Sequence, residues 1–442
     1  MKRVLFKTLG CKVNQYETQA MREQFLRAGY NETAIAQEAD VCIVNTCTVT
    51  HTSDRECRRI IRQLHRRNRL AKIVVTGCYT EKDAEIIATI EGVTQIIPNQ
   101  DKDRIAQLLD EDGSCSNHAD ESLYSPLKIT DFAGHDKAFV KIQDGCDHRC
   151  SYCKVPLVRG PSRSRPLDDI LDEVKVLVSN GFQEIILTGI CLGAWGRDLH
   201  KRRELSDAVE AITHIDGHFR VRLSSIEPNH VSKRLIEMLK VEKKLCGHLH
   251  IPLQSGADEV LRRMKRPYTA SKYESLVDEL RRQDRDFSLT TDLLVGFPGE
   301  GESHFQETLN LVRRIEPCRV HIFTYSPRPG TEAADIPSKN NPRVLKRRQD
   351  ELRAVVDEAS YKYRRRFVDE TLEVLIEDKT GGGGSLKGGY SDRYINVLVH
   401  GVDGHEGRLC DVKIRDVTSS YTIGDVVSEK EIKKEATGLL YA

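Results

Sequence analysis

The stretch Gly145–Cys153, GCDHRCSYC, places Cys146, Cys150 and Cys153 in a C-x3-C-x2-C motif just after a predicted strand. Three thiolates at this spacing can hold three corners of one [4Fe–4S] cube. No further cysteine follows until Cys191, so one iron would keep an open position, which indicates chemistry rather than a structural role. A zinc site with a distant fourth ligand is the alternative, although zinc sites favour paired C-x2-C motifs.

A second set of three cysteines lies in the N-terminal quarter of the chain. Cys11, Cys47 and Cys78 each follow a predicted strand, in the phrases TLGC, NTC and TGC. Because ligand sites lie at the C-terminal ends of parallel strands, we expect the three to meet at one sheet edge. Their spacing leaves open whether they bind a metal or are small buried apolar residues. The strands are predicted at Arg3–Thr8, Val41–Asn45, Lys72–Thr76 and Gln95–Pro98, and a helix at Thr18–Arg27.

Strand and helix patterns alternate along most of the chain, which indicates an α/β protein. After a polar linker, the alternation repeats at a spacing of about 35 residues, as in a full or partial (β/α) barrel. Short β-like runs at the end indicate a small β-barrel, and the GGGGS at 381–385 indicates a flexible turn or loop. We predict an N-terminal parallel α/β domain at 1–112, a linker at 113–131, a partial (β/α) barrel at 132–366 and a small β-barrel at 367–442.

Composition narrows the class of protein. With 39% hydrophobic and 31% charged residues among 442, the chain fits a soluble globular protein. No run approaches the roughly 20 apolar residues of a membrane span, and the N-terminus is not a secretory signal; we expect a cytoplasmic protein without membrane contact. Thirteen cysteines, an odd number, argue against a disulfide framework in that compartment. The net charge of +1 says nothing about nucleic acid.

The motifs resemble a known family. The segment around Cys146, with Tyr152 as the aromatic residue, resembles the radical-SAM signature C-x3-C-aromatic-x-C. TLGCKVNQYET, VNTCTVT and VTGCY resemble the N-terminal domain of the methylthiotransferase family, and the likeness continues in ILTGICLGAWG, RLSSIEP, HIPLQSG, TTDLLVGFPGE and FTYSPRPGT. The last segment is similar to TRAM domains, which are small RNA-binding β-barrels. Together these phrases cover essentially the whole chain.

The resemblance implies two [4Fe–4S] clusters and S-adenosylmethionine as cofactors, with an external one-electron donor. Cys146, Cys150 and Cys153 would hold the catalytic cluster, whose open iron chelates S-adenosylmethionine before reductive cleavage to a 5′-deoxyadenosyl radical. Cys11, Cys47 and Cys78 would hold a second cluster that carries the sulfur. Contacts to S-adenosylmethionine are expected from residues at strand ends, which are equally ordinary turn residues: Thr188, Gly189, Ser225, Glu227, Gln254 and Ser255.

Two phrases, GCKVNQYET and GPSRSR, most resemble the branch that acts on N6-threonylcarbamoyladenosine in tRNA. This implies methylthiolation of C2 of that nucleoside at position 37, by radical C–H abstraction and sulfur insertion. The alternatives are the branches that act on N6-isopentenyladenosine or on a ribosomal protein, and a non-catalytic iron–sulfur RNA-binding protein. The chain departs from the family at Cys191, Trp195 and Gly301, which puts the S-adenosylmethionine pocket in question.

A helix rich in arginine indicates that the protein binds tRNA. We expect the protein to be a monomer. Seven arginines lie within residues 55–69 against the single acid Glu56, and an apolar stripe of Cys57, Ile60, Ile61 and Leu64 opposes them. Such a face is expected to follow a phosphate backbone, although an ordinary solvated face is the alternative. The C-terminal segment is net acidic, so RNA binding there would need a local patch at Lys387, Arg393 and Lys413. The residues proposed to contact RNA are Arg55, Arg58, Arg59, Arg62, Arg66 and Arg69.

Overall fold

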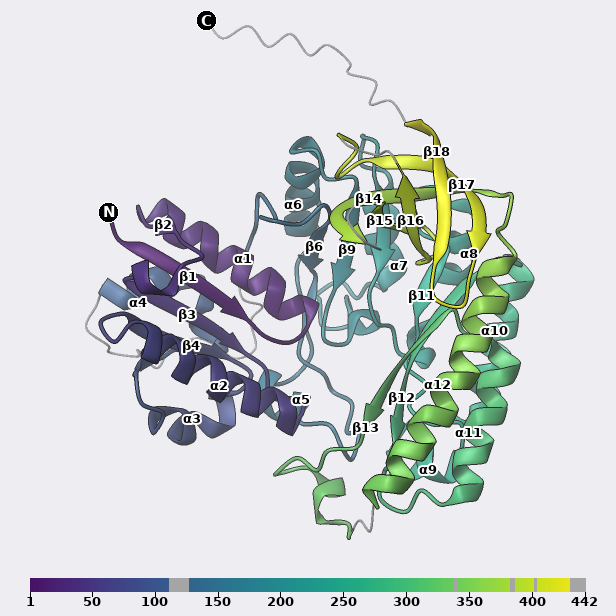
Figure 1. Ribbon diagram of the computed structural model, residues 1–442, viewed down its shortest axis with the longest axis horizontal. Coiled ribbons are helices and arrows are strands. Elements are labelled where there is room, and N and C mark those ends of the chain that lie inside the picture. Colours follow the sequence, from purple (N-terminus) through teal and green to yellow (C-terminus); the bar gives the residue numbers. More distant parts are fainter. Residues whose placement is uncertain (111–126, 338–340, 382–385, 401–403, 430–442) are drawn as a thin grey trace, which may run out of the picture.

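The chain folds into three successive parts: a parallel α/β sheet, a partial barrel and a small closed β-barrel (Figure 1). The computed structural model describes residues 1–110, 127–337, 341–381, 386–400 and 404–429. Most of the predicted linker, Cys115 and nearly all of the GGGGS stretch lie outside these residues. The predicted fold class is confirmed, whereas the four segment boundaries stay predictions.

The N-terminal sheet is parallel throughout, in the strand order β2-β1-β3-β4-β5. Strands β3 and β4 are buried almost completely, because helices cover both faces of the sheet. The strands are β1 (Arg3–Thr8), β2 (Asn31–Glu32), β3 (Val41–Thr46), β4 (Lys72–Gly77) and β5 (Val93–Ile96). The helices are α1 (Lys12–Arg27), α2 (His51–Arg67), α3 (Thr80–Ala88) and α4 (Ile105–Asp110), with the 3-10 turns η1 (Ala36–Glu38) and η2 (Asn99–Arg104).

Helix α1 begins at Lys12, earlier than the predicted start at Thr18. Its first turns carry buried polar residues, among them Asn14 and Glu17, so the sequence lacks an apolar helical stripe there. These polar side chains are buried because α1 packs against the neighbouring barrel. Tyr16 and Ala20 belong to the same apolar core as the barrel strands.

The central part is a six-stranded partial barrel in the order β6-β9-β10-β11-β12-β13. Two parallel three-stranded sheets meet through the bridges Val221–Leu245 and Ser225–His250. The strands are β6 (Ala138–Lys141), β9 (Glu184–Thr188), β10 (Arg220–Leu223), β11 (His248–His250), β12 (Ser288–Val295) and β13 (Arg319–Thr324). A short ladder joins β7 (Gln143–Asp144) to β8 (Arg163–Ser164).

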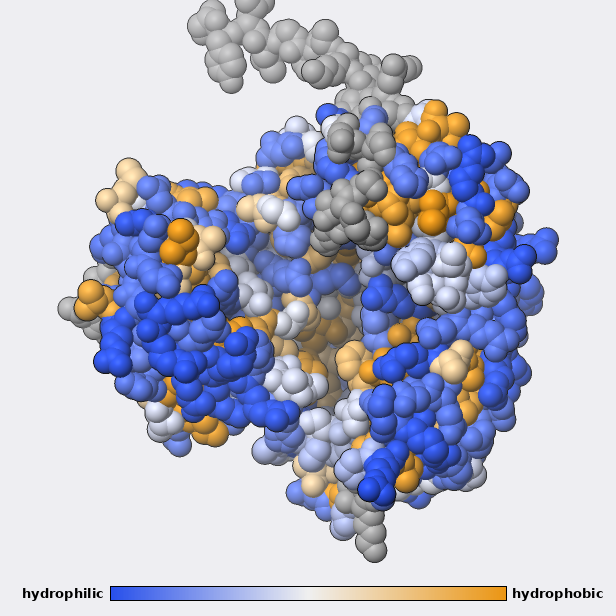
Figure 2. Space-filling view, in the orientation of Figure 1, coloured by the Kyte–Doolittle hydropathy of each residue, from blue (hydrophilic) through white to orange (hydrophobic). Residues whose placement is uncertain are grey.

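Helices cover the outside of the barrel, and α1 lies beside β6 (Figure 1). The helices are α5 (Val155–Arg159), α6 (Leu167–Ser179), α7 (Leu205–Thr213), α8 (Lys233–Val241), α9 (Asp258–Arg263), α10 (Ala270–Gln283) and α11 (Glu302–Ile315). The 3-10 turns are η3 (Leu192–Ala194), η4 (Pro228–His230) and η5 (Glu332–Asp335). Figure 2 shows a hollow between the N-terminal sheet part and the barrel.

The long helix α12 (Pro342–Arg365) leads to a closed barrel in the order β14-β15-β16-β18-β17. Arg220 and Arg222 fasten this barrel to β10, because both donate hydrogen bonds to its backbone carbonyls. Both guanidinium groups also pair with the buried carboxylate of Glu184. The strands are β14 (Thr371–Gly381), β15 (Leu386–Ser391), β16 (Asn396–His400), β17 (Leu409–Val417) and β18 (Thr422–Glu429).

A buried carboxylate, Glu17 of α1, joins the N-terminal sheet part to the barrel. It pairs with Lys102 at 2.5 Å, with Lys141 of β6 at 2.8 Å and with Arg159 of α5 at 2.5 Å. Burial alone would raise the pKa of Glu17, but the charges of Arg159, Lys102 and Lys141 outweigh it and hold the pKa well below its usual range. Three cations from separate elements therefore share this acid, and Lys141 and Arg159 also pair with Asp144 at 2.6 and 3.4 Å.

Replacing Glu17 by Gln should reduce the free energy of unfolding by about 3–5 kcal/mol, because the buried ammonium of Lys102 loses its carboxylate partner and Lys141 and Arg159 keep only Asp144. Circular dichroism during thermal and denaturant unfolding measures the loss. Glu32→Gln, which breaks the surface pair with Arg22, is the control and should cost at most about 1 kcal/mol. Equal midpoints for the two variants would contradict the role of Glu17.

The same carboxylate predicts a pH dependence. A folded pKa below the usual 4.5 means that the Glu17 contribution is fully present above pH 4.5 and is lost as the pH falls through the folded pKa. The difference in stability between the wild type and Glu17→Gln should therefore stay constant from neutral pH to about 5 and shrink below that.

Candidate metal centres

The three N-terminal cysteines lie at one edge of the sheet. Cys11, Cys47 and Cys78 follow the adjacent strands β1, β3 and β4, so the parallel order brings them together as expected. A Cβ added at Gly10, where φ is +100°, would lie 2.7 Å from the Cβ of Cys47, so the loop that carries Cys11 touches Cys47. Burial raises the pKa of Cys47 to about 11, and the charges of Cys78 and Cys11 add to that rise.

An arginine from the barrel side reaches this group. The Nε of Arg159 donates a hydrogen bond to the Sγ of Cys78 over 3.0 Å, while its Nη2 binds the Oδ1 of Asn14 over 2.5 Å. Burial raises the pKa of Cys78, and the charge of Arg159 opposes that effect. Because thiolates rather than thiols bind metals, a cation here favours metal binding.

The second cysteine group lies on the loop that follows β7. Backbone hydrogen bonds from Cys146 to Gly160 and from Cys153 to Cys150, each 3.1 Å long, fix the loop. Gly145 has φ of +72°, and a Cβ there would lie 1.8 Å from the carbonyl oxygen of Pro161. The loop therefore requires glycine at this position on two grounds, conformation and space.

Arg266 donates a hydrogen bond to a cysteine sulfur of this group, as Arg159 does in the first group. Its Nη1 donates to the Sγ of Cys150 over 3.3 Å, and its guanidinium is held by Glu227 and by the hydroxyl of Tyr268. Burial raises the pKa of Cys150, which the Arg266 charge and hydrogen bond counteract. Burial also raises the pKa of Cys153 to about 12. The loop is thus a partly buried thiol cluster with a cation beside it.

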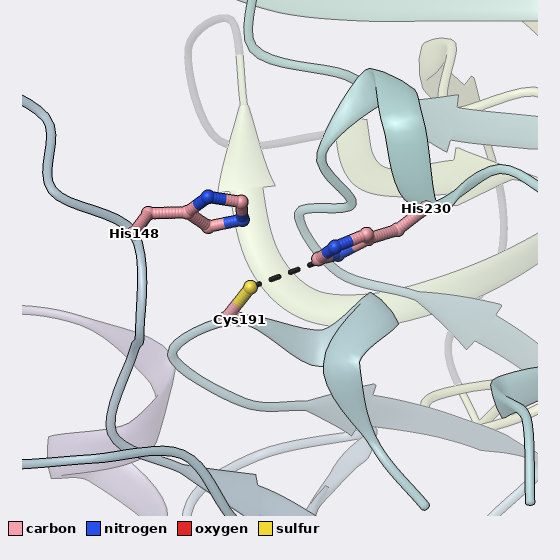
Figure 3. Close-up of side chains that lie close together, drawn as sticks. All are labelled: His148, Cys191 and His230. Carbon is pink, nitrogen blue, oxygen red and sulfur yellow. Dashed lines mark hydrogen bonds between the residues drawn. The ribbon is translucent and has the colours of Figure 1, made fainter. Parts of the chain in front are cut away.

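Cys191, one of the departures from the family pattern, lies beside this cluster. Figure 3 shows its thiol between the imidazoles of His148 and His230, with the Sγ 3.8 Å from the Nδ1 of His230. A hydrogen bond from Cys191 lowers the pKa of Cys146, and burial lowers that of His230 to about 4, so this imidazole is neutral at pH 7. The three side chains are close enough to share a metal ion, but the hydrogen bond from Cys191 also ties them to Cys146.

The residues expected to contact S-adenosylmethionine lie at the C-terminal ends of β9, β10 and β11. Thr188 ends β9 and Gly189 follows it; a Cβ at Gly189 would lie 2.8 Å from the Oε1 of Gln143. Ser225 and Glu227 follow β10, and Glu227 holds Arg266. Gln254 and Ser255 follow β11, and the Ser255 hydroxyl is buried and accepts from the backbone of Ala257. The Ser255 hydroxyl therefore stabilises the turn in which it lies.

The arginine helix presents most of its cations to solvent. Arg55, Arg59, Arg62 and Arg66 are exposed on α2, and Figure 2 shows a hydrophilic surface over this helix. Two of the predicted residues differ: Arg58 is half-buried and donates to the hydroxyl of Tyr79 over 2.5 Å, and Arg69 lies beyond the helix end.

Two of the three residues predicted to form a basic patch on the C-terminal barrel are paired with acidic side chains. Lys387 pairs with Glu406, and Arg393 pairs with Asp284 of the central part. These two cations hold the fold together rather than forming a free surface. The face of α2 is consequently the stronger candidate for contact with RNA.

Four residues near the cysteines are not predicted from the sequence: Lys12, Gln143, Arg159 and Arg266. Gln143 accepts from the backbone N–H of Cys191 over 2.7 Å and donates to the carbonyl of Gly145, so it joins the cysteine loop to the end of β9. None of the four stands in a spacing pattern. Only the fold reveals what they contact.

Comparisons with known proteins agree with this arrangement. Residues 140–312 match the model of the Radical SAM superfamily, and residues 3–98 match that of the Uncharacterized protein family UPF0004. The chain is 35% identical to the threonylcarbamoyladenosine tRNA methylthiotransferase MtaB of Bacillus subtilis (strain 168), over 97% of each chain. It is 36% identical to the protein of that name from Thermotoga maritima, over 99% of this chain and 100% of the relative.

A relative with a different name is less similar. The tRNA-2-methylthio-N(6)-dimethylallyladenosine synthase of Desulfitobacterium hafniense is 31% identical, over 97% of this chain and 98% of the relative. Among solved structures, the radical S-adenosylmethionine methyltransferase TsrM of Kitasatospora setae has a TM-score of 0.57 at 14% identity, over 76% of this chain and 77% of that one. This likeness concerns the fold.

Within the described ranges, no helix is both long and apolar enough to cross a membrane.

Gly145→Ala should empty one of the two cysteine groups, because its Cβ collides with Pro161 in the loop that carries Cys146. Elemental analysis of anaerobically purified protein should show metal content falling to about half, with the N-terminal group still loaded. Gly134→Ala is the matched control, since φ there is +73° but nothing lies within 4 Å. Full metal content in Gly145→Ala would refute this account of the loop.

Proposed function

The chain belongs to the methylthiotransferase family of radical-SAM enzymes, and we propose that it methylthiolates C2 of N6-threonylcarbamoyladenosine at position 37 of tRNA. One observation carries this proposal: two groups of three cysteines occur on two packed parts of the fold, one at the sheet edge and one in the barrel loop. The higher identity to relatives named for the threonylcarbamoyl substrate supports this branch over the dimethylallyl branch.

We propose that Cys146, Cys150 and Cys153 hold the cluster that binds S-adenosylmethionine, and that Cys11, Cys47 and Cys78 hold the second. The residues fit such groups, because each set offers three thiol donors and a buried arginine aimed at one sulfur. When bound and reduced by an external one-electron donor, the first cluster with S-adenosylmethionine would supply a 5′-deoxyadenosyl radical, the second cluster would supply sulfur, and a second S-adenosylmethionine would supply the methyl group.

The protein's own groups prepare both sites. Arg159 and Arg266 donate N–H groups to the Sγ atoms of Cys78 and Cys150, which stabilises the anionic thiolates. Gln143 ties the Cys146 loop to the strand end at Gly189, where the methionyl amine of S-adenosylmethionine is proposed to bind. Glu227 holds Arg266 in place.

Two sites are needed because of the target bond. The C2–H bond of adenine is strong and not acidic, so a general base cannot remove this hydrogen. A carbon radical can abstract it, and sulfur must then come from a donor close to the same carbon. Glu17 and Arg159 hold the sheet edge that carries Cys11 against the barrel. The substrate base is proposed to enter the hollow between them.

The proposal is tested with anticodon stem-loop RNAs carrying either N6-threonylcarbamoyladenosine or N6-isopentenyladenosine. The reconstituted, reduced enzyme should methylthiolate the first RNA, as measured by nucleoside mass spectrometry. Cys146→Ala should lose both 5′-deoxyadenosine formation and product, whereas Cys11→Ala should keep 5′-deoxyadenosine formation and lose the methylthio product.

Each other outcome supports a different function. Product on the isopentenyl RNA alone would assign the chain to that branch, and product on ribosomal protein alone would assign it to the third branch. A wild type that holds two clusters and binds RNA but forms no 5′-deoxyadenosine would be a non-catalytic binding protein.

The exposed arginines of α2 are proposed to contact tRNA phosphates. The triple variant Arg55→Gln, Arg62→Gln and Arg66→Gln should weaken tRNA binding about 10-fold or more at 100 mM salt. The slope of log affinity against log salt should fall by about one for each arginine–phosphate pair that the substitutions remove. Arg282→Gln, Arg313→Gln and Arg353→Gln, on exposed arginines of α10, α11 and α12, remove equal charge as the control. Equal losses of affinity in both triple variants would contradict a phosphate-binding face on α2.

A further inference from the structure

Lys12 is a cation beside the proposed sulfur site. It follows Cys11 directly, begins α1 and is partly buried. Within the described part of the chain its ammonium takes part in no hydrogen bond or ion pair. The end of α1 that carries it is turned toward the barrel (Figure 1), on the side where Figure 2 shows the hollow.

The groups around Lys12 already have partners of their own. The charged groups whose field reaches Lys12 are Lys137, Arg222, Cys11 and Asp292. Lys137 pairs with Glu377 at 2.5 Å, and Arg222 pairs with Glu184 at 3.0 Å.

The one carboxylate among these neighbours is also engaged. Asp292 of β12 accepts from the Nε2 of His250 at 3.2 Å and from the Nδ1 of His321 at 3.0 Å. Lys12 is thus the member of this group whose charge the protein leaves unbalanced. A partly buried cation is costly unless an anion meets it, so the bound substrate is expected to bring one.

The proposed substrate carries such an anion at the required place. C2 and N6 of adenine lie on the same edge of the ring, on either side of N1. If sulfur from the Cys11 group reaches C2, the substituent on N6 extends alongside that group. A threonylcarbamoyl substituent ends in a carboxylate, whereas an isopentenyl substituent is entirely apolar.

We propose that the ammonium of Lys12 binds the threonyl carboxylate of the substrate and thereby selects the threonylcarbamoyl nucleoside; this inference rests on the function proposed above. Lys12 donates up to three N–H groups, and a carboxylate accepts them in charge-assisted hydrogen bonds. An apolar substituent would leave the ammonium desolvated and unpaired. Rejection of the isopentenyl nucleoside then follows from the same residue.

The test separates the carboxylate from the rest of the substrate. Two anticodon stem-loop RNAs are compared, one with N6-threonylcarbamoyladenosine and one in which the threonine carboxylate is a carboxamide. The wild type should bind the carboxylate RNA on the order of 10- to 100-fold more tightly. Lys12→Met should bind both RNAs alike, at the affinity that the wild type shows for the carboxamide.

Two variants control for indirect effects. Lys12→Arg keeps the charge and should restore most of the preference, and Lys7→Met, on an exposed lysine of β1, should leave it unchanged. Iron content and the visible spectrum of Lys12→Met should match the wild type, which shows that the Cys11 group still holds its cluster.

Failure of this inference differs from failure of the proposed function. If the wild type methylthiolates the threonylcarbamoyl RNA but binds the two RNAs equally, or if Lys12→Met keeps the preference, Lys12 is not the carboxylate-binding residue and the function stands. If the wild type acts on the isopentenyl RNA alone, the proposed function is wrong and the role of Lys12 with it.

Discussion

The buried carboxylate of Glu17 holds together the two halves on which the chemistry depends. Its three cationic partners come from η2, β6 and α5, so the N-terminal sheet edge is fixed against the barrel. Arg159 extends the network, because the same guanidinium binds Glu17 and the sulfur of Cys78. The position of one proposed cluster is thereby coupled to the interface itself.

The two cysteine groups share one electrostatic feature, a buried thiol beside an arginine. The first set of thiols follows the C-terminal ends of three parallel strands, where loops can converge. The second set lies on the single loop that follows β7. In each, burial raises a thiol pKa while an arginine opposes the effect, Arg159 at Cys78 and Arg266 at Cys150. Metal binding needs the deprotonated form, so these arginines favour loading without coordinating the metal.

Charge is balanced tightly in the barrel and left unbalanced where a ligand is proposed to enter. Arg220 and Arg222 share Glu184 and dock the C-terminal barrel. Asp292 is shared by two histidines. Against this background, the Lys12 ammonium next to Cys11 differs, because it has no hydrogen-bond or ion-pair partner among the residues that the structure describes. The exposed arginines of α2 are an excess of positive charge on the outer surface.

The sequence by itself determined the fold class, the two cysteine groups and the strands they follow, because these are written in local spacing and strand periodicity. It misplaced the start of α1, since buried polar residues such as Asn14 and Glu17 conceal an apolar stripe. Only the tertiary structure decided which cations reach the sulfurs, that Arg58 turns inward to Tyr79, and that Lys12 has no counterion within the described ranges. Contacts between residues far apart in the chain, such as Arg159 with Cys78, depend on how elements pack, and no local pattern encodes that.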